Sequence, residues 1–209
     1  MKLNLSVDQA LSTTRSVRKR LDLTKPVPRA VIEECLELAL QAPNGSNRNN
    51  WRWIVMDEPA LIAKIGSLYK DVMDEIIDAK RAEQSNIPGT GHVLDAGFNF
   101  ASRIGTAPAL LIPLMKGRAD GQTVPEQAGM WGSIVQAVWS FFLALRERGL
   151  GSVWTTISLY REKQIAELLG IPFEQHTQVG LFPIAYTVGT EFKRAWRKPV
   201  AEVMTYNKY

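Results

Sequence analysis

Sulfur and imidazole side chains are scarce in this sequence. Its 209 residues include one cysteine, Cys35, and two histidines, His92 and His176. A single cysteine excludes a disulfide within the chain and is typical of a reducing compartment. Cys35 lies in an apolar helical pattern, so we expect it in the core rather than as a nucleophile. Neither a Ser-His-Asp grouping nor a metal-ligand spacing is present, so if the protein is an enzyme we expect a bound organic cofactor to carry the chemistry.

Long apolar runs are missing as well. No stretch reaches the ~18 consecutive apolar residues of a membrane span, and the N-terminus has no apolar run typical of a secretion signal. We therefore predict a cytoplasmic protein that does not bind membranes. The formal net charge is only +4, and its cations are spread among acids. This pattern favours a solvated surface first, an anionic cofactor or substrate second and nucleic acid third. Tryptophan and tyrosine do not alternate with a basic stripe, so no nucleic-acid partner is predicted.

Glycine-rich nucleotide motifs are also absent. There is no GKS or GKT phosphate loop. The run Gly149-Leu150-Gly151 lacks the third glycine of a dinucleotide fingerprint, and it follows a predicted helix rather than a strand. A Rossmann-type dinucleotide site is therefore not expected.

The hydrophobic periodicity predicts helices mixed with four strands. The first strand comes only after two helices, which favours an α+β fold over a regular βαβ repeat. A hydrophobic content of 45% is enough for one globular domain covering residues 1–209. Helices are predicted at 6–13, 28–42, 57–76, 126–148 and 160–169, and strands at 51–56, 107–115, 149–157 and 178–188. In the second helix the stripe Val31, Cys35, Leu38 and Ala42 is expected to be buried. Pro113 suggests that its strand lies at an edge or that the strand ends there. His92 is expected at the surface or in a lid, and His176 at the surface.

The loop after the second helix contains Asn44-Gly45-Ser46-Asn47-Arg48-Asn49-Asn50, following Pro43 and preceding Trp51. Its amide groups can both donate and accept hydrogen bonds, as the mixed edges of a flat heterocycle require. On composition alone, an ordinary helix-to-strand loop explains it equally well.

The segment Thr14-Arg15-Ser16-Val17-Arg18 is expected to be extended, which places Ser16 and Arg18 on one face and Arg15 and Val17 on the other. Two guanidinium groups and a hydroxyl suit a phosphate monoester. The alternative is a basic run on the surface.

The helix at 126–148 is apolar on most sides: Ile134, Val138, Phe141, Phe142 and Leu145 recur, with Val135 and Trp139 beside them. Such a helix must be central to its fold or packed against a second copy of the chain.

Over nearly its whole length the chain resembles the FMN-dependent nitroreductase family. Four sequence motifs match those of the family in the same order: Arg15-Ser16-Val17-Arg18, Ala42-Pro43-Asn44-Gly45-Ser46-Asn47, Gly149-Leu150-Gly151-Ser152 and Arg197-Lys198-Pro199. The resemblance implies an intertwined homodimer in which a central, mostly antiparallel sheet is flanked by helices and one FMN occupies each of two interface clefts.

The resemblance also implies which residues contact the cofactor. Arg15, Ser16, Arg18 and Arg197 match the segments that hold the flavin phosphate and ribityl chain. Asn44, Gly45, Ser46 and Asn47 match the segment along the isoalloxazine ring, and Trp154, Thr155 and Thr156 match the residues beside its N5 edge. No catalytic side chain and no metal is implied. The sequence departs from the family pattern at Thr14, Asn44, Asn49 and Asn50, where many relatives have Arg, Ser, Gln and Pro.

The activity implied is reduction of a flat small-molecule electron acceptor, such as a nitroaromatic or a quinone. NAD(P)H would reduce flavin N5 and leave before the acceptor enters, which is a ping-pong mechanism. Two alternatives stay open. The Thr155-Thr156 pair also resembles reductive dehalogenases of the iodotyrosine deiodinase type, and the protein could be an FMN carrier or sensor that does not turn over NAD(P)H. The substrate lid is expected from residues 70–94 and 116–125.

Overall fold

A six-stranded antiparallel sheet forms the centre of the computed structural model, which describes residues 2–84 and 91–209. The strand order is β1-β6-β3-β2, with β4 also paired to β6 and β5 also paired to β3. Together with the helices, this confirms the predicted α+β class. The strands are β1 (Leu21–Asp22), β2 (Trp51–Met56), β3 (Ala109–Lys116), β4 (Leu150–Gly151), β5 (His176–Gln178) and β6 (Phe182–Thr187).

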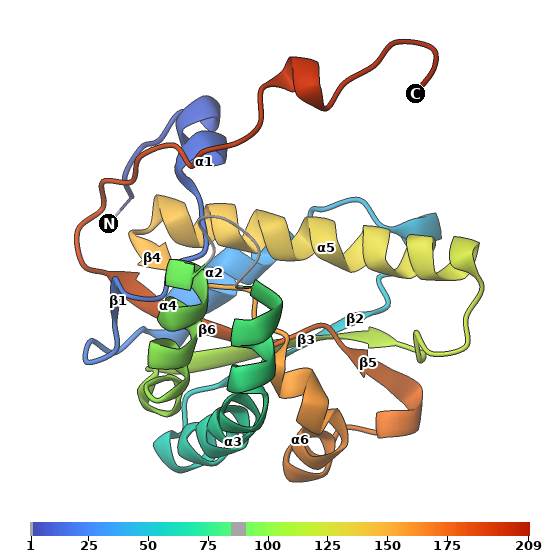
Figure 1. Cartoon of the computed structure of the whole chain (residues 1–209). Coiled ribbons are helices and arrows are strands. Elements are labelled where there is room, and N and C mark those ends of the chain that lie inside the picture. The colour runs from blue at the N-terminus through green and yellow to red at the C-terminus, as the bar shows by residue number, and fades with distance from the viewer. Residues whose placement is uncertain (1, 85–90) are drawn as a thin grey trace.

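Helices cover both faces of the sheet (Figure 1). α2 and α5 pack on one face, whereas α3, α4 and α6 lie on the other, so the core consists of two apolar clusters separated by the sheet. α1 packs against α5. The α-helices are α1 (Val7–Thr13), α2 (Arg29–Ala39), α3 (Pro59–Gln84), α4 (Gly91–Ala101), α5 (Val124–Glu147) and α6 (Glu162–Leu169). The short 3₁₀ helices are η1 (Gly45–Asn47), η2 (Ile104–Thr106), η3 (Ile157–Arg161), η4 (Phe173–Gln175) and η5 (Val200–Glu202).

Helix ends follow local side-chain chemistry closely. The Ser6 hydroxyl accepts from Gln9 N, and the Gln9 side chain accepts from Ser6 N, which completes the predicted capping box of α1. Gly149 and Gly170 end α5 and α6 with φ of 70° and 66°, a conformation that favours glycine. The ends predicted for these helices agree with the structure to within two residues.

The predicted buried stripe of α2 is partly wrong. Ile32, Cys35 and Ala39 are fully buried, whereas Leu38 is 51% exposed. The helix therefore faces the sheet along a line rotated from the predicted one, because packing against α5 selects the buried face. Pro28 caps α2 in an extended conformation and precedes the helix. Cys35 is a core residue as predicted, and burial raises the pKa of its thiol to about 11.

The sequence context of Pro113 suggested a sheet edge or a strand end, and the structure contradicts this prediction. Pro113 sits within β3, which has β2 on one side and both β5 and β6 on the other. The missing N–H is tolerated because residues 179–181, between β5 and β6, face this position without regular pairing. The Pro113 carbonyl still accepts from Val179 N at 3.0 Å.

Two of the four predicted strands are much shorter than predicted. Within 149–157 only Leu150 and Gly151 pair as a strand, and Thr155 forms one isolated bridge to Leu181. The run 178–188 is divided between β5 and β6. His176, predicted in a surface loop, begins β5 and is half-buried. Local β-propensity was present, but the chain bends where these segments approach residues 15–18 and α6.

By length and composition, α5 could cross a membrane. The search for uninterrupted apolar residues in the sequence did not identify it, because polar residues interrupt the apolar stretch of the helix. Its buried side chains, including Ile134, Val138 and Phe141, pack in the core against the sheet and α2. Those contacts are typical of a core helix. Val135 and Trp139 on its other side are 41% and 39% exposed.

Part of the predicted lid lies outside the described residues. Residues 70–84 belong to α3 and 91–101 to α4, whereas residues 85–90 and the side chain of His92 are not described.

Candidate functional site

The segment after α1 is held beside the chain that leaves β4. Val17 N donates to Ser152 O at 2.9 Å, and the Val17 side chain is buried. Arg15 and Ser16 remain exposed, and Arg18 is half-buried. Two of the four family motifs, at 15–18 and 149–152, are therefore in contact in the folded chain.

Arg18 is a cation that the structure leaves without a carboxylate partner among the described residues. Burial lowers the pKa of its guanidinium, and the nearby hydroxyl of Tyr69 on α3 opposes this shift. Tyr69 is itself buried, which raises the pKa of its phenol. A desolvated guanidinium without a counter-charge is suited to receive an anion or a carbonyl oxygen.

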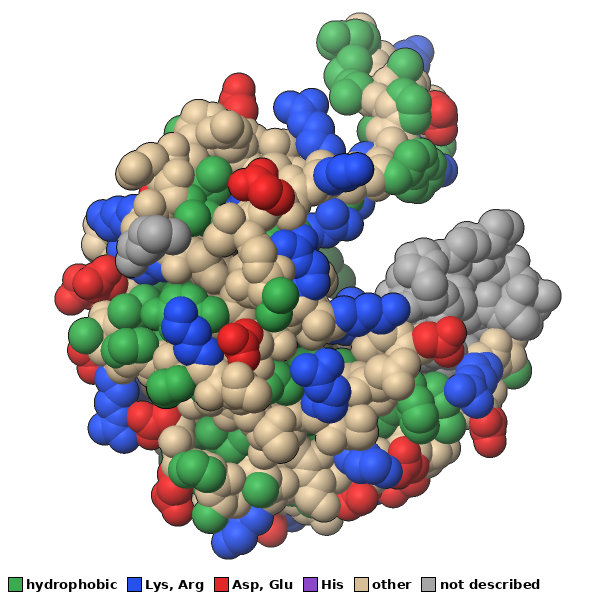
Figure 2. All heavy atoms as spheres, turned by 90° about the vertical axis from the view of Figure 1, so that its left-hand side faces the viewer, with side chains coloured by type: hydrophobic (Ala, Val, Ile, Leu, Met, Phe, Trp, Pro, Cys, Tyr) green, Lys and Arg blue, Asp and Glu red, His purple; other side chains and the backbone are tan. Residues whose placement is uncertain are grey.

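The C-terminal tail runs past the same segment. Arg15 Nη1 donates to Lys193 O at 3.0 Å, and Arg20 donates to the carbonyls of Val188 and Glu191. Arg197 is exposed, and among the described residues its side chain donates to its neighbour Trp196 O alone. Figure 2 shows Lys and Arg side chains running from the base of the tail onto the body. Thus Arg15 fastens the tail, while Arg197 is left accessible.

The residues after β4 divide into two that support the fold and one that is accessible. Trp154 Nε1 donates to Val179 O, and the Thr155 hydroxyl donates to Leu181 O at 2.7 Å. Thr156 is exposed. Of the three predicted contacts in this group, only Thr156 has an accessible hydroxyl that could donate a hydrogen bond. Ser152 adds a buried hydroxyl without a partner among the described residues, and sequence reasoning did not select it.

The loop after Pro43 is closed by its own side chains. Asn44 Oδ1 accepts from Asn49 N at 2.9 Å, and Asn44 Nδ2 donates to Asn49 Oδ1 at 3.2 Å. Ser46, Asn47 and Asn49 all have positive φ, near 50°. Asn and, less readily, Ser tolerate this conformation. Two positions that depart from the family pattern, 44 and 49, are therefore hydrogen-bond partners of each other.

Ser133 of α5 attaches this loop to the helix. Its hydroxyl accepts from Gly45 N at 2.9 Å and donates to Gly129 O at 2.7 Å. Hydrogen bonds to Asn49 and to Ser133 thus occupy the Asn44 amide and the Gly45 N–H, respectively. Ser46 and Asn47 are exposed. Nothing in the local sequence marked Ser133, because the contact joins residues 88 positions apart.

A pocket of about 380 Å³ opens between this loop, the end of β3 and the start of α5. Its walls include the predicted site residues Asn44, Gly45 and Ser46, and the predicted lid segment at 116–125 supplies Lys116, Gly117, Arg118, Gln122 and Pro125. Sequence reasoning assigned no role to the other wall residues, which are Arg48, Asn50, Trp51, Met115, Glu126, Gly129, Met130 and Ser133.

The loop at 44–47 and the segment that follows α1 lie at different positions along α5. The loop at 44–47 is tied to Ser133, whereas α1 is tied to Arg146 through Thr13 Oγ1. Ser133 and Arg146 are separated by about 20 Å along the axis, at roughly 1.5 Å per residue. Figure 1 shows the loop after α2 beside the yellow N-terminal half of α5, and α1 beside its C-terminal end. Within one chain these two groups of predicted site residues are therefore attached to α5 at points about 20 Å apart.

Comparisons with known proteins agree with this fold. A profile of the nitroreductase family matches residues 11–186. The Bacillus subtilis (strain 168) protein YfhC, provisionally named an NAD(P)H nitroreductase, is 24% identical over 161 residues, covering 77% of this chain and 74% of YfhC.

Two solved structures are similar throughout. A nitroreductase-like family protein from Bacillus cereus has a TM-score of 0.68 at 23% identity, with 100% of both chains covered. An oxidized iodotyrosine deiodinase bound to FMN and 3-iodo-L-tyrosine has a TM-score of 0.72 at 21% identity, covering 96% of this chain and 98% of that one. At these identities the two structures establish the fold.

Proposed function

The chain belongs to the nitroreductase family, and from that premise we propose that it is an FMN-dependent oxidoreductase that uses NAD(P)H to reduce flat acceptors such as nitroaromatics or quinones. The observation that carries the proposal is Arg18, a half-buried cation without a described carboxylate partner, in a segment that also exposes Ser16 and is bonded through Val17 N to Ser152 O. The whole of residues 1–209 would act as one FMN-binding domain in the cytoplasm.

The available donors fit FMN. Ser16, Arg18 and Arg197 would hold its phosphate and ribityl chain, with Arg15 keeping the tail in place. The Ser46 hydroxyl and the Asn47 Nδ2 group would meet the ring, while Asn47 Oδ1 accepts from Asn49 Nδ2, Gly45 contributes backbone and Asn44 shapes the loop. Thr156 would donate to the N5 edge, and Trp154 and Thr155 would support that edge. When bound, FMN would supply hydride exchange at N5 with NAD(P)H and then the acceptor, a ping-pong sequence.

A complete site requires two chains. Because the two groups of residues lie about 20 Å apart along α5, the loop at 44–47 of one chain would complete the site of a second chain. The tail supports a homodimer: it projects from the body in Figure 1 and carries exposed apolar side chains suited to cover a partner. These are Trp196, Val200, Val203, Met204 and Tyr206.

Reductive dehalogenation is a second candidate. The Thr155-Thr156 pair and the fold shared with the iodotyrosine deiodinase favour it. Iodide release from 3-iodo-L-tyrosine by the reduced protein would support it. An FMN carrier or sensor would bind FMN but fail to oxidise NAD(P)H.

The first test is the absorbance spectrum of the purified protein, before and after anaerobic NADPH and then NADH. We expect a flavin band that one or both donors bleach and that a nitroaromatic restores. A band that neither donor bleaches would indicate a carrier or sensor. A colourless protein that does not take up added FMN would refute the cofactor assignment.

The closed Asn44–Asn49 loop gives a second prediction. Asn49→Ala removes the amide contacts and places alanine at a φ of 51°, which costs about 1–2 kcal/mol of backbone strain. We expect the FMN dissociation constant to rise about tenfold, measured by flavin fluorescence titration. Asn49→Gly relieves the strain but lacks the amide, so its affinity should fall between those of the wild type and Asn49→Ala. If the affinity is the same in all three proteins, the loop is not shaped by this pair.

A further inference from the structure

The walls of the pocket beside the 44–50 loop carry three cations and one carboxylate, and two of those cations form no ion pair with any described residue. Arg118 is fully engaged: it donates to both oxygens of Glu162 at 2.8 and 2.9 Å and to Asp120 at 2.6 Å. The hydrogen bonding of Arg118 to the Glu162 carboxylate, which accepts, is the main reason that the pKa of Arg118 is raised. This arginine therefore shapes the wall and is not available to a ligand.

Glu126, the pocket's carboxylate, is also engaged. It accepts from Thr123 N at 2.9 Å and from Thr123 Oγ1 at 2.5 Å, and these hydrogen bonds lower the pKa of its carboxyl. It acts as the capping residue at the start of α5.

Arg48 and Lys116 remain. Both line the pocket, and neither forms an ion pair with any described residue. Lys116 N bonds Asn50 O at 2.8 Å, which brings the end of β3 to the loop that carries Arg48. Arg48 and Lys116 are therefore the cations of the wall without a described carboxylate partner. The apolar side chains of Trp51, Met115 and Met130 complete the walls.

We propose that this pocket receives the carboxylate-bearing end of an aromatic electron acceptor, with Arg48 as its main ligand and Lys116 assisting. The inference rests on the proposed function, which places Asn44, Gly45 and Ser46 along the flavin ring. When the aromatic ring of the acceptor stacks on the flavin ring, its carboxylate substituent would extend into the pocket. A volume of about 380 Å³ is at the small end of ligand pockets and suits a single-ring acid. A phosphate of NAD(P)H has similar charge, so the experiment must separate the two.

The test compares 4-nitrobenzoate with the neutral 4-nitrobenzyl alcohol in steady-state assays of the FMN-loaded protein. For Arg48→Gln we expect the ratio of the two KM values, acid over alcohol, to rise about tenfold, as loss of one charge-assisted hydrogen bond predicts. Lys116→Gln should raise the same ratio by a smaller factor. Benzoate, which is not reduced, provides a readout independent of turnover: its dissociation constant, from perturbation of the oxidised flavin spectrum, should rise by the same factor as the KM of the acid.

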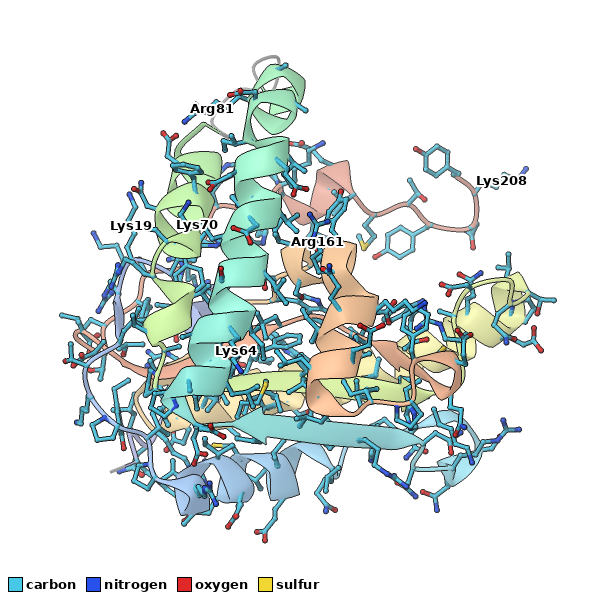
Figure 3. The ribbon with its side chains drawn as sticks, turned by 90° about the horizontal axis from the view of Figure 1, so that it is seen from below. Lys19, Lys64, Lys70, Arg81, Arg161 and Lys208 are labelled. Carbon is cyan, nitrogen blue, oxygen red and sulfur yellow. The ribbon has the colours of Figure 1, made fainter. Side chains whose placement is uncertain are left out.

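Lys64→Gln is the matched control, because this exposed lysine lies on α3, on the other face of the sheet (Figure 3). It should leave the KM ratio and the benzoate constant unchanged. An unchanged KM ratio in Arg48→Gln would overturn the inference. A rise only in the KM of NADPH or NADH would also overturn it, because the two cations would then bind the hydride donor. Failure of the proposed function looks different: the protein would not take up FMN or would reduce neither acceptor.

Discussion

Arg18→Gln is expected to raise the FMN dissociation constant about 10- to 100-fold without destabilising the apoprotein. A charge-assisted hydrogen bond contributes about 1.5–3 kcal/mol, which converts to that range of affinity. In the apoprotein the same guanidinium is desolvated without a described carboxylate partner. Its removal should therefore leave the thermal unfolding temperature unchanged or slightly higher. Fluorescence titration with FMN and thermal unfolding of the apoprotein measure the two effects separately.

Lys19→Gln is the matched control, since it removes an exposed cation one position away. Its FMN affinity should change by less than about twofold, as expected for a solvated charge. If both variants weaken binding equally, the effect comes from general charge and the assignment of Arg18 is wrong. If Arg18→Gln lowers the unfolding temperature markedly, Arg18 is a structural residue.

The same variant tests whether one site uses two chains. Arg18→Gln chains are unfolded and refolded together with Asn49→Ala chains. In a mixed dimer, one site would combine both changes and the other would be intact. Random pairing then restores wild-type affinity in about a quarter of all sites. A mixture that shows only the average of the two parent proteins would place both groups of residues in one chain's site.

Gly66→Ala is expected to have the largest effect on stability. Gly66 in α3 faces Gly105 in η2, and an added Cβ would lie 2.3 Å from Gly105 Cα and 2.6 Å from Gly105 N. Because the opposing atoms are backbone, the two helices must separate. We expect a loss of about 2 kcal/mol or more after the gain in helix propensity. For a chain of this length that lowers the unfolding temperature by about 4–8 °C.

Gly97→Ala provides the comparison within the same helical layer. Its added Cβ would meet only the flexible end of Met73, at 3.6 Å. The improved helix propensity should then leave stability equal or higher by up to about 1 kcal/mol. If Gly66→Ala unfolds at the wild-type temperature, the close approach of α3 and η2 is not a constraint on the fold.

Features that depend on neighbouring residues were determined by the sequence itself. The Ser6–Gln9 capping box, the β2 boundaries and the glycine ends of α5 and α6 all agree with the predictions, because a cap or a turn is decided by side chains within four residues. The four family motifs also identified the nitroreductase family from the sequence alone.

The tertiary structure decided everything that depends on a distant partner. Leu38 is exposed because α5 selects the buried face of α2, and Pro113 is central because two strands share one side of β3. Ser133 reaches Gly45 across 88 positions, and the loop at 44–47 and α1 contact different parts of α5. Periodicity specifies that a face is buried but not what buries it. For that reason the sequence and its family resemblance predicted the site residues and the homodimer, whereas only the fold showed that the loop at 44–47 and α1 attach to α5 at points about 20 Å apart.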